Sequence, residues 1–469
     1  MNQPQPPAGR KHESCTRLTR RDVFRGAAAT AVAATIVPRR VLGGAARPAP
    51  SDRIHVAGIG VGGVGYGQLQ ACDQAGFHIA ALCDVDDAYA KKAYDRWAQA
   101  KRFHDFREML NVLDKEIDAV YCGTPDHTHA VITLAALRKK KHVCCVKPLT
   151  RTIHECRTVV DMARQAGVAT QVTASPNTSE AACRTCELIW AGAIGPVREV
   201  HIWSNRPLWP QGMSRPAGED PVPSTFNWNL WIGPAPMRPF KAVWPKGDLA
   251  LAQVLSGSPR PAVYHPWNFR GWWDFGTGAL GDMGCHHLNT PYRALKLKHP
   301  SRVHATATKV LPETAPLASV VAYDFPARED MPPVRVIWYD GGLRPPCPKE
   351  MEGETLPAEG TLYVGQKGMM LGSRVLPKSR ASQLDSVPRT LPRRPGTWGE
   401  WFEACKGSER AGCHFEWAAL LTEFVLLGNI AIRTGRHLEW DGVSGRFTNN
   451  AEANKYLREE YREGWSLEA

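Results

Sequence analysis

Residues 54–172 alternate between short β-type runs and helix-type segments, and this alternation constrains the fold more than any other feature of the chain. Strands that alternate with helices predict a doubly wound parallel sheet, an α/β fold. Ligands of such a sheet bind beyond the carboxyl ends of its strands, so the residues that follow each run are candidates for a site. The expected strands are 54–59, 77–83, 119–122, 142–146 and 168–172, and the expected helices are 61–75, 87–100, 107–113, 130–140 and 151–166.

A glycine-rich turn, Gly60-Val61-Gly62-Gly63-Val64-Gly65, follows the first expected strand. Its glycines allow a tight turn, a close approach of the backbone to a pyrophosphate and close packing of helix on strand. Asp84 ends the next strand, where a carboxylate can accept hydrogen bonds from the adenosine ribose and would repel a 2′-phosphate. The pattern predicts a Rossmann domain that binds NAD rather than NADP; a glycine turn without a nucleotide is the alternative. The expected cofactor-binding residues here are Gly60, Gly62, Gly63, Val64, Gly65 and Asp84.

The segment Thr124-Pro125-Asp126-His127-Thr128-His129 follows the strand at 119–122. It lies where the ribose or nicotinamide of a dinucleotide would bind, so we expect Thr124, Pro125 and His129 to contact the cofactor. Asp126 or Thr128 could instead cap the next helix. The two histidines have no third ligand at suitable spacing, so we predict no metal site.

Lys147 follows the strand at 142–146 and is fixed by Pro148. An ammonium group beside the nicotinamide can hydrogen-bond a substrate hydroxyl and favour an alkoxide-like transition state. Lys147 is therefore expected both to bind the cofactor and to take part in catalysis. A solvated surface lysine is the alternative that this motif leaves open.

The stretch Gly278–Asn289 places Asp282 and His286 four residues apart, on one face if the stretch is helical. An imidazole held by a carboxylate is suited to proton transfer. Removal of a hydride from a carbinol carbon also requires removal of the hydroxyl proton. We therefore expect His286 as the base and Asp282 as the group that orients it, with core or surface histidines as the alternative.

Taken together, these motifs resemble the Gfo/Idh/MocA family of NAD(P)-dependent oxidoreductases, over about residues 51–465. The resemblance implies that Lys147, Asp282 and His286 match the family's catalytic positions, and that the substrate is a sugar or polyol. Residues 228–234 and 449–454 look like those of its exported bacterial branch. Two positions depart from the family: Val146 replaces a glutamate beside Lys147, and Asn289 replaces a frequent aspartate. The valine could tune the lysine, weaken cofactor placement or end turnover.

Beyond residue 174 we expect a C-terminal α+β domain with a large, mostly antiparallel open sheet. Its expected strands are 197–203, 303–310, 319–325, 334–339 and 360–364, with helices at 414–434 and 450–464. Residues 201–275 hold eight of the 16 tryptophans, and aromatic faces can bind sugars, although core or oligomer packing is the alternative for each. The expected substrate-binding residues are Asn205, Arg206, Trp209, His286 and His287.

The net charge of +12 is concentrated at the N-terminus, since residues 1–50 hold nine Lys/Arg and two acids, a net +7, and leave +5 for the rest. That distribution does not favour nucleic acid. Residues 19–25 contain a twin-arginine pattern followed by an uncharged, alanine-rich run, which predicts a twin-arginine export signal and a periplasmic protein free of the membrane. The expected parts are 1–50 (signal and linker), 51–173 (NAD-binding domain) and 174–469 (substrate-binding domain with C-terminal helices).

The leading hypothesis is an NAD-dependent sugar or polyol dehydrogenase that is a homo-oligomer. Because an exported enzyme cannot draw on a cytoplasmic pool, its NAD could stay tightly bound and cycle. That possibility leads to a second hypothesis, an NAD-dependent glycosidase that works by transient oxidation and elimination. A non-catalytic NAD-binding protein is the third.

Overall fold

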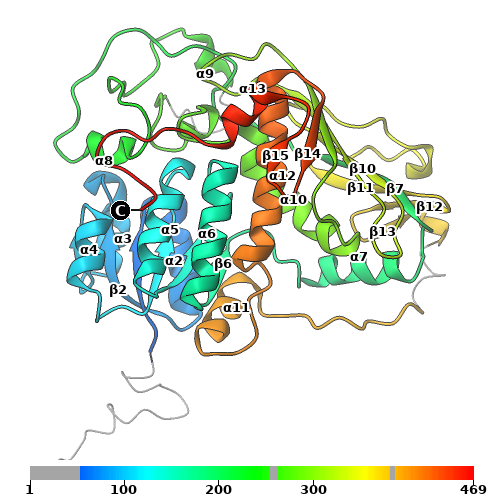
Figure 1. Ribbon diagram of the computed structural model, residues 1–469, viewed down its shortest axis with the longest axis horizontal. Helices are drawn as coiled ribbons and strands as arrows, with labels where there is room; N and C mark the ends of the chain where they lie inside the picture. The colour runs from blue at the N-terminus through cyan, green and yellow to red at the C-terminus, as the bar shows by residue number, and fades with distance from the viewer. Residues whose placement is uncertain (1–52, 254–260, 381–385, 469) are drawn as a thin grey trace, which may run out of the picture. The chain divides into compact units, whose positions relative to one another are not determined.

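Six parallel strands form the first sheet of the computed structural model, which describes residues 53–253, 261–380 and 386–468 (Figure 1). Every strand pairing within this sheet is parallel, as predicted. The chain order reverses between β1 and β4, so the crevice beyond their carboxyl ends is the topological switch point. In sheet order the strands are β3 (Lys101–Phe103), β2 (His78–Cys83), β1 (His55–Ile59), β4 (Ala119–Cys122), β5 (His142–Cys145) and β6 (Thr170–Val172).

The helices of this first part begin and end where local sequence signals place them. Helix α6 starts with a capping box between Thr152 and Glu155 and ends at Gly167, whose φ of 65° suits a residue without Cβ. Helix α3 is capped by Asp86, whose carboxylate accepts from two backbone N–H groups of the first turn. The helices are α2 (Val64–Gln74), α3 (Asp87–Arg96), α4 (Phe106–Val112), α5 (His129–Arg138) and α6 (Ile153–Ala166).

The second sheet has nine strands and is antiparallel except for the parallel pair β7 and β10. The expected large, mostly antiparallel sheet is thus confirmed, and its strands at both edges were not predicted. In sheet order they are β13 (Arg374–Leu376), β12 (Gly368–Leu371), β11 (Gly360–Gly365), β7 (Val197–Trp203), β10 (Val334–Tyr339), β9 (Ser319–Phe325), β8 (Arg302–Ala307), β14 (Leu438–Asp441) and β15 (Arg446–Phe447).

The remaining helices connect or cover the two sheets. They are α7 (Glu180–Trp190), α8 (Trp228–Ile232), α9 (Leu249–Gln253), α10 (Gly278–Ala294), α11 (Gly396–Cys405), α12 (Phe415–Thr434) and α13 (Ala451–Asn454). Single 3₁₀ turns occur at η2 (Asp126–Thr128), η3 (Asn268–Gly271), η4 (Lys349–Met351) and η6 (Lys455–Leu457).

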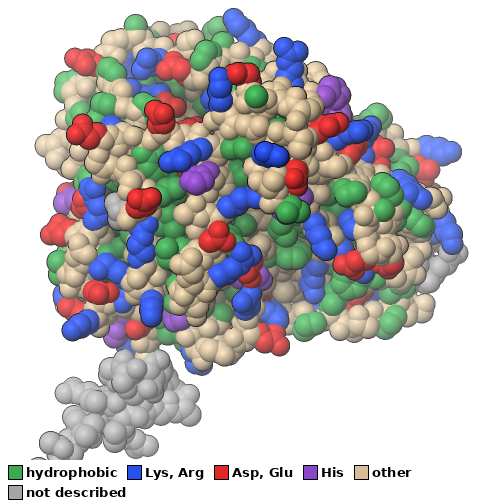
Figure 2. All heavy atoms as spheres, viewed as in Figure 1, with side chains coloured by type: hydrophobic (Ala, Val, Ile, Leu, Met, Phe, Trp, Pro, Cys, Tyr) green, Lys and Arg blue, Asp and Glu red, His purple; other side chains and the backbone are tan. Residues whose placement is uncertain are grey.

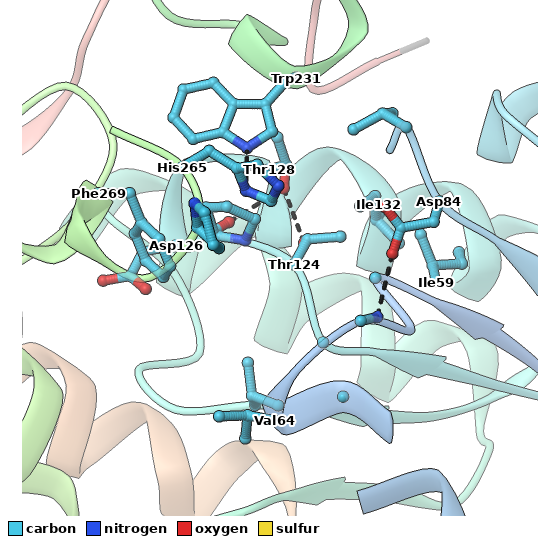
Figure 3. A pocket seen from close by; sticks show the side chains of 18 of the residues that line it. Ile59, Val64, Asp84, Thr124, Asp126, Thr128, Ile132, Trp231, His265 and Phe269 are labelled. Carbon is cyan, nitrogen blue, oxygen red and sulfur yellow. Dashed lines mark hydrogen bonds between the residues drawn. The ribbon is translucent and has the colours of Figure 1, made fainter. Parts of the chain in front are cut away.

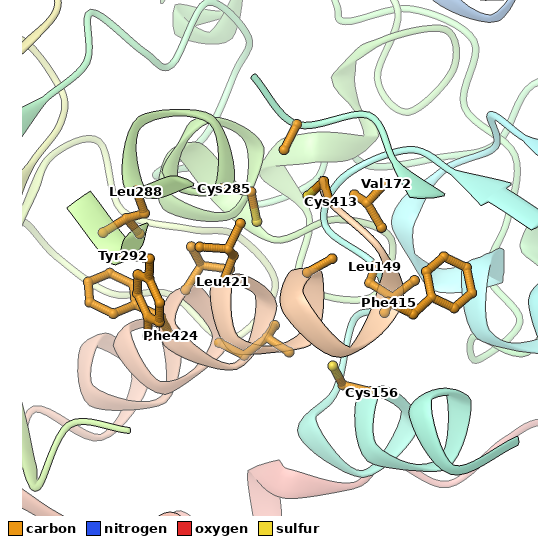
Figure 4. Close-up of a cluster of buried hydrophobic side chains, with 14 of the residues drawn as sticks. Leu149, Cys156, Val172, Cys285, Leu288, Tyr292, Cys413, Phe415, Leu421 and Phe424 are labelled. Carbon is orange, nitrogen blue, oxygen red and sulfur yellow. The ribbon is translucent and has the colours of Figure 1, made fainter. Parts of the chain in front are cut away.

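Helix α12 lies between the two sheets and contacts α6 on one side and α10, β8 and β9 on the other (Figures 1 and 4). Its Thr422 hydroxyl accepts a hydrogen bond from the backbone N–H of Leu149 at 3.1 Å, and its Glu423 pairs with Arg157 of α6 at 2.9 Å. Its length and apolar composition would also suit a membrane span, but 78% of that apolar stretch is buried, as in a core helix. Residues 54–469 consequently form one compact unit.

Two expectations for the ends of the chain have different outcomes. The helix expected over 450–464 is wrong, because α13 ends at Asn454 and one 3₁₀ turn follows before the chain runs on without regular structure to residue 468. Side chains of that tail bond to other elements, as with Tyr461 to Glu155 and Arg462 to Asn229. The expected export signal lies outside the described residues.

Candidate active site

A cleft at the switch point encloses about 1190 Å³ of empty space, part of it open to solvent. The glycine turn after β1 forms one side. Residues 204–277, between β7 and α10, form a long connection that we call the Trp-rich connection. Figure 3 shows Trp231 and His265, from this connection, on the opposite side from Val64. Lys147, Arg270 and Asp282 line one part of the cleft, and Asp84, Phe106 and Trp465 line another. The cleft therefore combines the strand ends of the first sheet with residues from more distant parts of the chain.

The glycine turn has the shape that a pyrophosphate requires. Gly60 has a φ of +74°, and a Cβ on Gly65 would lie 2.0 Å from the carbonyl oxygen of Gly60. Only glycine fits at these two positions without moving backbone atoms, and the turn leads directly into the N-terminus of α2. A Cβ on Gly62 would instead meet the ring of Tyr89 at 2.1 Å. The turn therefore fits the dinucleotide for which it was predicted, and Tyr89 lies over it.

Asp84 is buried at the end of β2 and holds the glycine turn in place. One carboxylate oxygen accepts from the backbone N–H of Val61 at 2.8 Å and of Gly62 at 3.2 Å, and the other accepts from the N–H of Asp86 at 3.1 Å. Burial raises the pKa of the Asp84 carboxyl, and these three hydrogen bonds and His265 oppose that shift. The oxygen that accepts only from Asp86 retains a lone pair that a ribose hydroxyl could use.

The segment after β4 lies in the same cleft, but its residues have different tasks. Thr124 and Pro125 line the cleft, as expected. His129 is fully buried, and its two ring nitrogens lie 2.8 Å from the carbonyl oxygens of Pro148 and Thr124. His129 thus joins the turn after β4 to the turn after β5 and does not line the cleft. The prediction that His129 contacts the cofactor directly is therefore wrong.

His129 also lies close to two buried thiols. Its ring and the sulfur atoms of Cys122 and Cys145 offer three metal-ligand atoms within 4.8 Å of one another. Because each ring nitrogen already faces a carbonyl oxygen, a metal ion would have to replace one of those hydrogen bonds.

Lys147 meets Asp282 across the cleft. Its ammonium nitrogen lies 2.6 Å from a carboxylate oxygen of Asp282 and also bonds the Asp282 carbonyl oxygen. The same carboxylate oxygen accepts from Nε of Arg270 at 2.8 Å. The Arg270 guanidinium in turn stacks over the ring of Trp267, 4.2 Å from its centroid. The strand end of the first sheet and helix α10 therefore share one charged cluster.

The charge states in this cluster follow from burial and from these neighbours. Burial alone would raise the pKa of the Asp282 carboxyl, but Lys147 and Arg270 hold it well below its usual range. Burial, together with the charge of Lys147, lowers the pKa of His286 to about 3. Asp282 is accordingly a carboxylate and His286 a neutral imidazole at neutral pH, and the same shift makes this imidazole a weaker base than a solvent-exposed histidine.

The expected pairing of Asp282 with His286 is wrong in its detail. The two residues do lie one turn apart on α10, but the carboxylate of Asp282 bonds Lys147 and Arg270. Nδ1 of His286 lies 3.2 Å from the hydroxyl of Ser175. Two buried cations on one carboxylate are a stronger attraction than one neutral imidazole, which explains the outcome.

Asn289, where the family often has aspartate, supports Ser175. Its side-chain N–H donates to the Ser175 carbonyl at 2.7 Å, and its oxygen accepts from Trp417 at 2.6 Å and from Asn177 at 3.3 Å. An aspartate could accept the last two bonds but could not donate the first. The asparagine therefore fixes the residue that contacts His286.

Val146 lines the cleft beside Lys147 and packs against a buried cluster of the first sheet that includes Val56, Leu69 and Tyr121. A glutamate there would place a second carboxylate near the ammonium. In this chain Asp282 supplies the negative charge, and Arg270 adds a second positive one.

The expected substrate residues do not all lie in reach of a substrate. Arg206 bonds Asn205 and Glu359, and Nε2 of His287 lies 3.4 Å from Glu359, so three of them form one polar group. Trp209 is wrong as a sugar-binding residue, because it is fully buried and donates to the side-chain oxygen of Gln211 at 3.0 Å. Seven of the eight tryptophans in this region are buried: Trp203, Trp209, Trp228, Trp231, Trp244, Trp272 and Trp273. Four of them, Trp228, Trp231, Trp244 and Trp272, belong to the hydrophobic core of the connection.

Sequence reasoning missed Arg270 and Ser175. Arg270 is 12 residues from Asp282 along the chain, on a 3₁₀ turn within an irregular connection, so no periodicity links the two. Ser175 follows β6 by three residues, and a search of strand ends extended to that strand could have found it.

Comparisons with known proteins bear on the first sheet above all. Residues 54–174 match the profile of the GFO_IDH_MocA family, described as an oxidoreductase family with an NAD-binding Rossmann fold. Inositol 2-dehydrogenase of Salmonella paratyphi B is 31% identical over 112 residues, 23% of this chain and 33% of that protein. A glycosyl hydrolase family 109 protein of Shewanella woodyi is 32% identical over 122 residues, 24% of this chain and 26% of that protein. The matches thus span about a third or less of these relatives.

Solved structures are similar over both sheets. The WlbA dehydrogenase of Bordetella pertussis, in complex with NADH and UDP-GlcNAcA, has a TM-score of 0.55 and 14% identity, over 83% of this chain and 99% of that chain. At this identity the likeness establishes the two-sheet fold alone. The family profile, together with the glycine turn and Asp84, shows that residues 54–174 are similar to the NAD-binding Rossmann domain of the Gfo/Idh/MocA oxidoreductase family.

Proposed function

We propose that this protein is an NAD-dependent oxidoreductase that acts on a carbinol of a sugar, polyol or glycoside. The observation that carries the proposal is the cluster in which Lys147, from the first sheet, bonds Asp282 one helical turn from His286. Lys147 and Asp282 line the switch-point cleft, and His286 lies on the next turn of α10. An ammonium group and a neutral imidazole on neighbouring turns can serve the oxygen and the proton of an alcohol that is being oxidised.

The cofactor would be held by the glycine turn, by Asp84 and by the turn after β4. When bound there, NAD supplies the hydride acceptor. The chain itself manages the proton and the oxygen: neutral His286 accepts the hydroxyl proton, and Lys147 stabilises the developing negative charge on the oxygen. Asp282 holds the ammonium in position, and Arg270 keeps that carboxylate ionised. We favour NAD over NADP because Asp84 would face a 2′-phosphate with a buried carboxyl group.

The substrate class is inferred from relatives and from the site. Relatives are named for inositol and for glycosides, and a structural neighbour was solved with a nucleotide sugar. The polar group around Glu359, with Arg206 and His287, offers donors and acceptors of the kind that sugar hydroxyls bond. The test is to incubate the purified protein with a panel of sugars, polyols and glycosides and to follow NADH at 340 nm.

An NAD-dependent glycosidase is the second candidate, favoured by the relative named as a family 109 glycosyl hydrolase. In that reaction a ring hydroxyl is oxidised, the acidified neighbouring C–H loses a proton, the glycosidic group leaves, and the hydride returns. Release of an aglycone from a nitrophenyl glycoside without net NADH supports the glycosidase. Stoichiometric NADH without aglycone supports the dehydrogenase.

A non-catalytic NAD-binding protein is the third candidate, suggested by Val146. A Val146→Glu variant that gains turnover, beside a parent without turnover, would support it. Turnover by the parent that is lost in Lys147→Ala would exclude it.

Two further proposals concern where and in what form the protein works. The twin-arginine pattern at residues 19–25 supports export to the periplasm, and fractionation of cells that express the full chain tests this. A homo-oligomer is proposed as well, and light scattering of the mature protein tests that.

A further inference from the structure

The C-terminal tail, residues 458–468, is bound along its length although it contains no regular structure; we call it the C-terminal strap. Glu459 pairs with the buried guanidinium of Arg151, and the hydroxyl of Tyr461 bonds Glu155 at the start of α6. Near its end, the carbonyl oxygen of Leu467 accepts from Arg138 of α5. Figure 1 shows the strap running from α13 across the ends of α6 and α5. These contacts recur every few residues and hold the strap against the Rossmann domain.

Arg462 attaches the strap to the Trp-rich connection. Its guanidinium donates to the carbonyl oxygen of Asn229 at 3.0 Å, to the Asn229 side chain at 2.6 Å and to the carbonyl oxygen of Gly233 at 3.0 Å. These groups belong to α8 and the residue that follows it, so the arginine satisfies carbonyls at a helix C-terminus. Helix α8 also carries Trp231, which lines the cleft and donates to His265 at 3.2 Å. The strap and the wall opposite the glycine turn are thus fastened to each other.

Trp465 brings the strap to the cleft itself. Its half-buried ring lines the cleft together with Phe106, whose ring centroid lies 6.2 Å away, and the guanidinium of Arg107 lies 4.6 Å over its face. Val85 and His104 also line this part of the cleft, and Nδ1 of His104 lies 3.2 Å from the carbonyl oxygen of Asp84. If the Asp84 carboxylate bonds the adenosine ribose, the adenine must extend into this part of the cleft.

We propose that Trp465 is an adenine-binding residue and that the C-terminal strap keeps the dinucleotide from exchanging during turnover. The proposal rests on the proposed use of NAD at this site. An indole presents a flat apolar face on which a base can stack. For the adenine to leave, the strap has to move, and that breaks the hydrogen bonds of Arg462 and Tyr461. Retained NAD would have to be restored within each catalytic cycle. The strap therefore favours reactions that return the hydride, to the same substrate or to a second carbonyl compound, over release of free NADH.

The experiment compares cofactor retention and release in the full chain. Parent, Trp465→Ala, Trp465→Phe, Arg462→Met and the control Arg458→Met are purified natively, and dinucleotide per chain is measured after gel filtration. Arg458 is an exposed arginine of the same strap, which makes it the matched control. Release of NADH is then followed by its fluorescence after mixing with excess NAD. Melting temperatures establish that each variant is folded.

We expect the parent, Trp465→Phe and Arg458→Met to retain dinucleotide. Trp465→Ala should release NADH faster by about 5- to 150-fold, the loss expected for one base-stacking contact. Arg462→Met should also release it faster, and if that variant does not fold, Trp465→Ala alone decides. Equal release rates in the parent and Trp465→Ala overturn the role of the strap while leaving NAD binding intact. A parent that binds no NADH at all overturns the proposed cofactor instead.

Discussion

The two ends of the cleft are built in different ways. The part of the nucleotide end that would hold pyrophosphate and ribose uses backbone groups and glycines from one continuous segment, Gly60 to Asp84, so its shape follows from local sequence. The reacting end uses charged side chains from three distant segments, Lys147, Arg270 and Asp282. Its geometry exists only when both sheets have packed together. The segment Gly60 to Asp84 should therefore keep its shape when residues elsewhere in the chain are changed, whereas the reacting end should be sensitive to such changes.

Removal of the ammonium group should separate the two ends most clearly. Lys147→Met should lower kcat by about 10²- to 10³-fold, the usual loss when a group that stabilises a developing oxyanion is removed. The dissociation constant for NADH, measured by fluorescence titration, should change by less than about threefold, because the nucleotide end is built separately. Lys115→Met, at an exposed site, is the control. A large loss of NADH affinity with unchanged kcat would contradict the comparison.

A methyl group in the glycine turn should have the opposite pattern. Gly65→Ala places a Cβ 2.0 Å from a backbone oxygen that cannot move cheaply, so we expect a loss of about 1–3 kcal/mol in the free energy of unfolding. NADH affinity should fall about tenfold or more. Gly67→Ala, two residues further along the same helix and with no atom within 4 Å of its added Cβ, is the matched control. Equal affinities in the two variants would show that the turn does not hold the cofactor.

Asn289→Asp tests how far the support of the reacting end extends. The substituted carboxylate would face the Ser175 carbonyl oxygen instead of donating to it, which leaves a buried acceptor without its bond at a cost of about 1–3 kcal/mol. We expect a lower melting temperature and a kcat reduced about three- to tenfold, with KM little changed. Protonation of the new carboxyl at low pH should restore part of the donor, so the deficit should shrink there. A deficit that does not vary with pH would argue for general destabilisation only.

The smallest effect that we expect is that of low pH on His286. Because burial and Lys147 lower the pKa of His286 to about 3, protonation of His286 should not reduce kcat/KM between pH 5 and 8. Stability should respond differently. Below about pH 6.5 the unfolded chain takes up a proton that folded His286 does not accept, so unfolding free energy should fall as pH drops toward 3. Melting curves of the parent and of His286→Gln across this range isolate the contribution, and equal slopes would contradict it.

The first sheet could be predicted because its signals are local. Strand ends, the glycine turn and the capping box between Thr152 and Glu155 all lie within a few residues of what they determine. Even the position of Lys147 follows, since the ends of parallel strands meet at one edge of the sheet. The i and i+4 spacing of Asp282 and His286 likewise gave the correct helix and face.

The remaining features depend on packing between distant segments. Nothing in the residues around Arg270 indicates that it bonds Asp282, and nothing in Glu459 to Leu467 indicates partners on α5, α6 and α8. The prediction that Trp209 binds sugar was wrong for a related reason. Exposed and buried aromatic residues look the same in a sequence, and here a long connection without a sheet of its own needs them as its core: Phe226, Trp228, Trp231 and Phe240 pack against Tyr264 and Trp272.

Helix α12 has a consequence for how substrate reaches this site. Its Thr422 bonds Leu149, two residues after Lys147, and its Asn429 donates to the carbonyl oxygen of Thr277, at the start of the helix that carries His286. Helix α12 therefore bonds both the segment next to Lys147 and the start of the helix that carries His286. A movement of one sheet relative to the other would break these hydrogen bonds. We therefore expect the site to select substrates by its preformed shape and not by closure of the two sheets around the substrate.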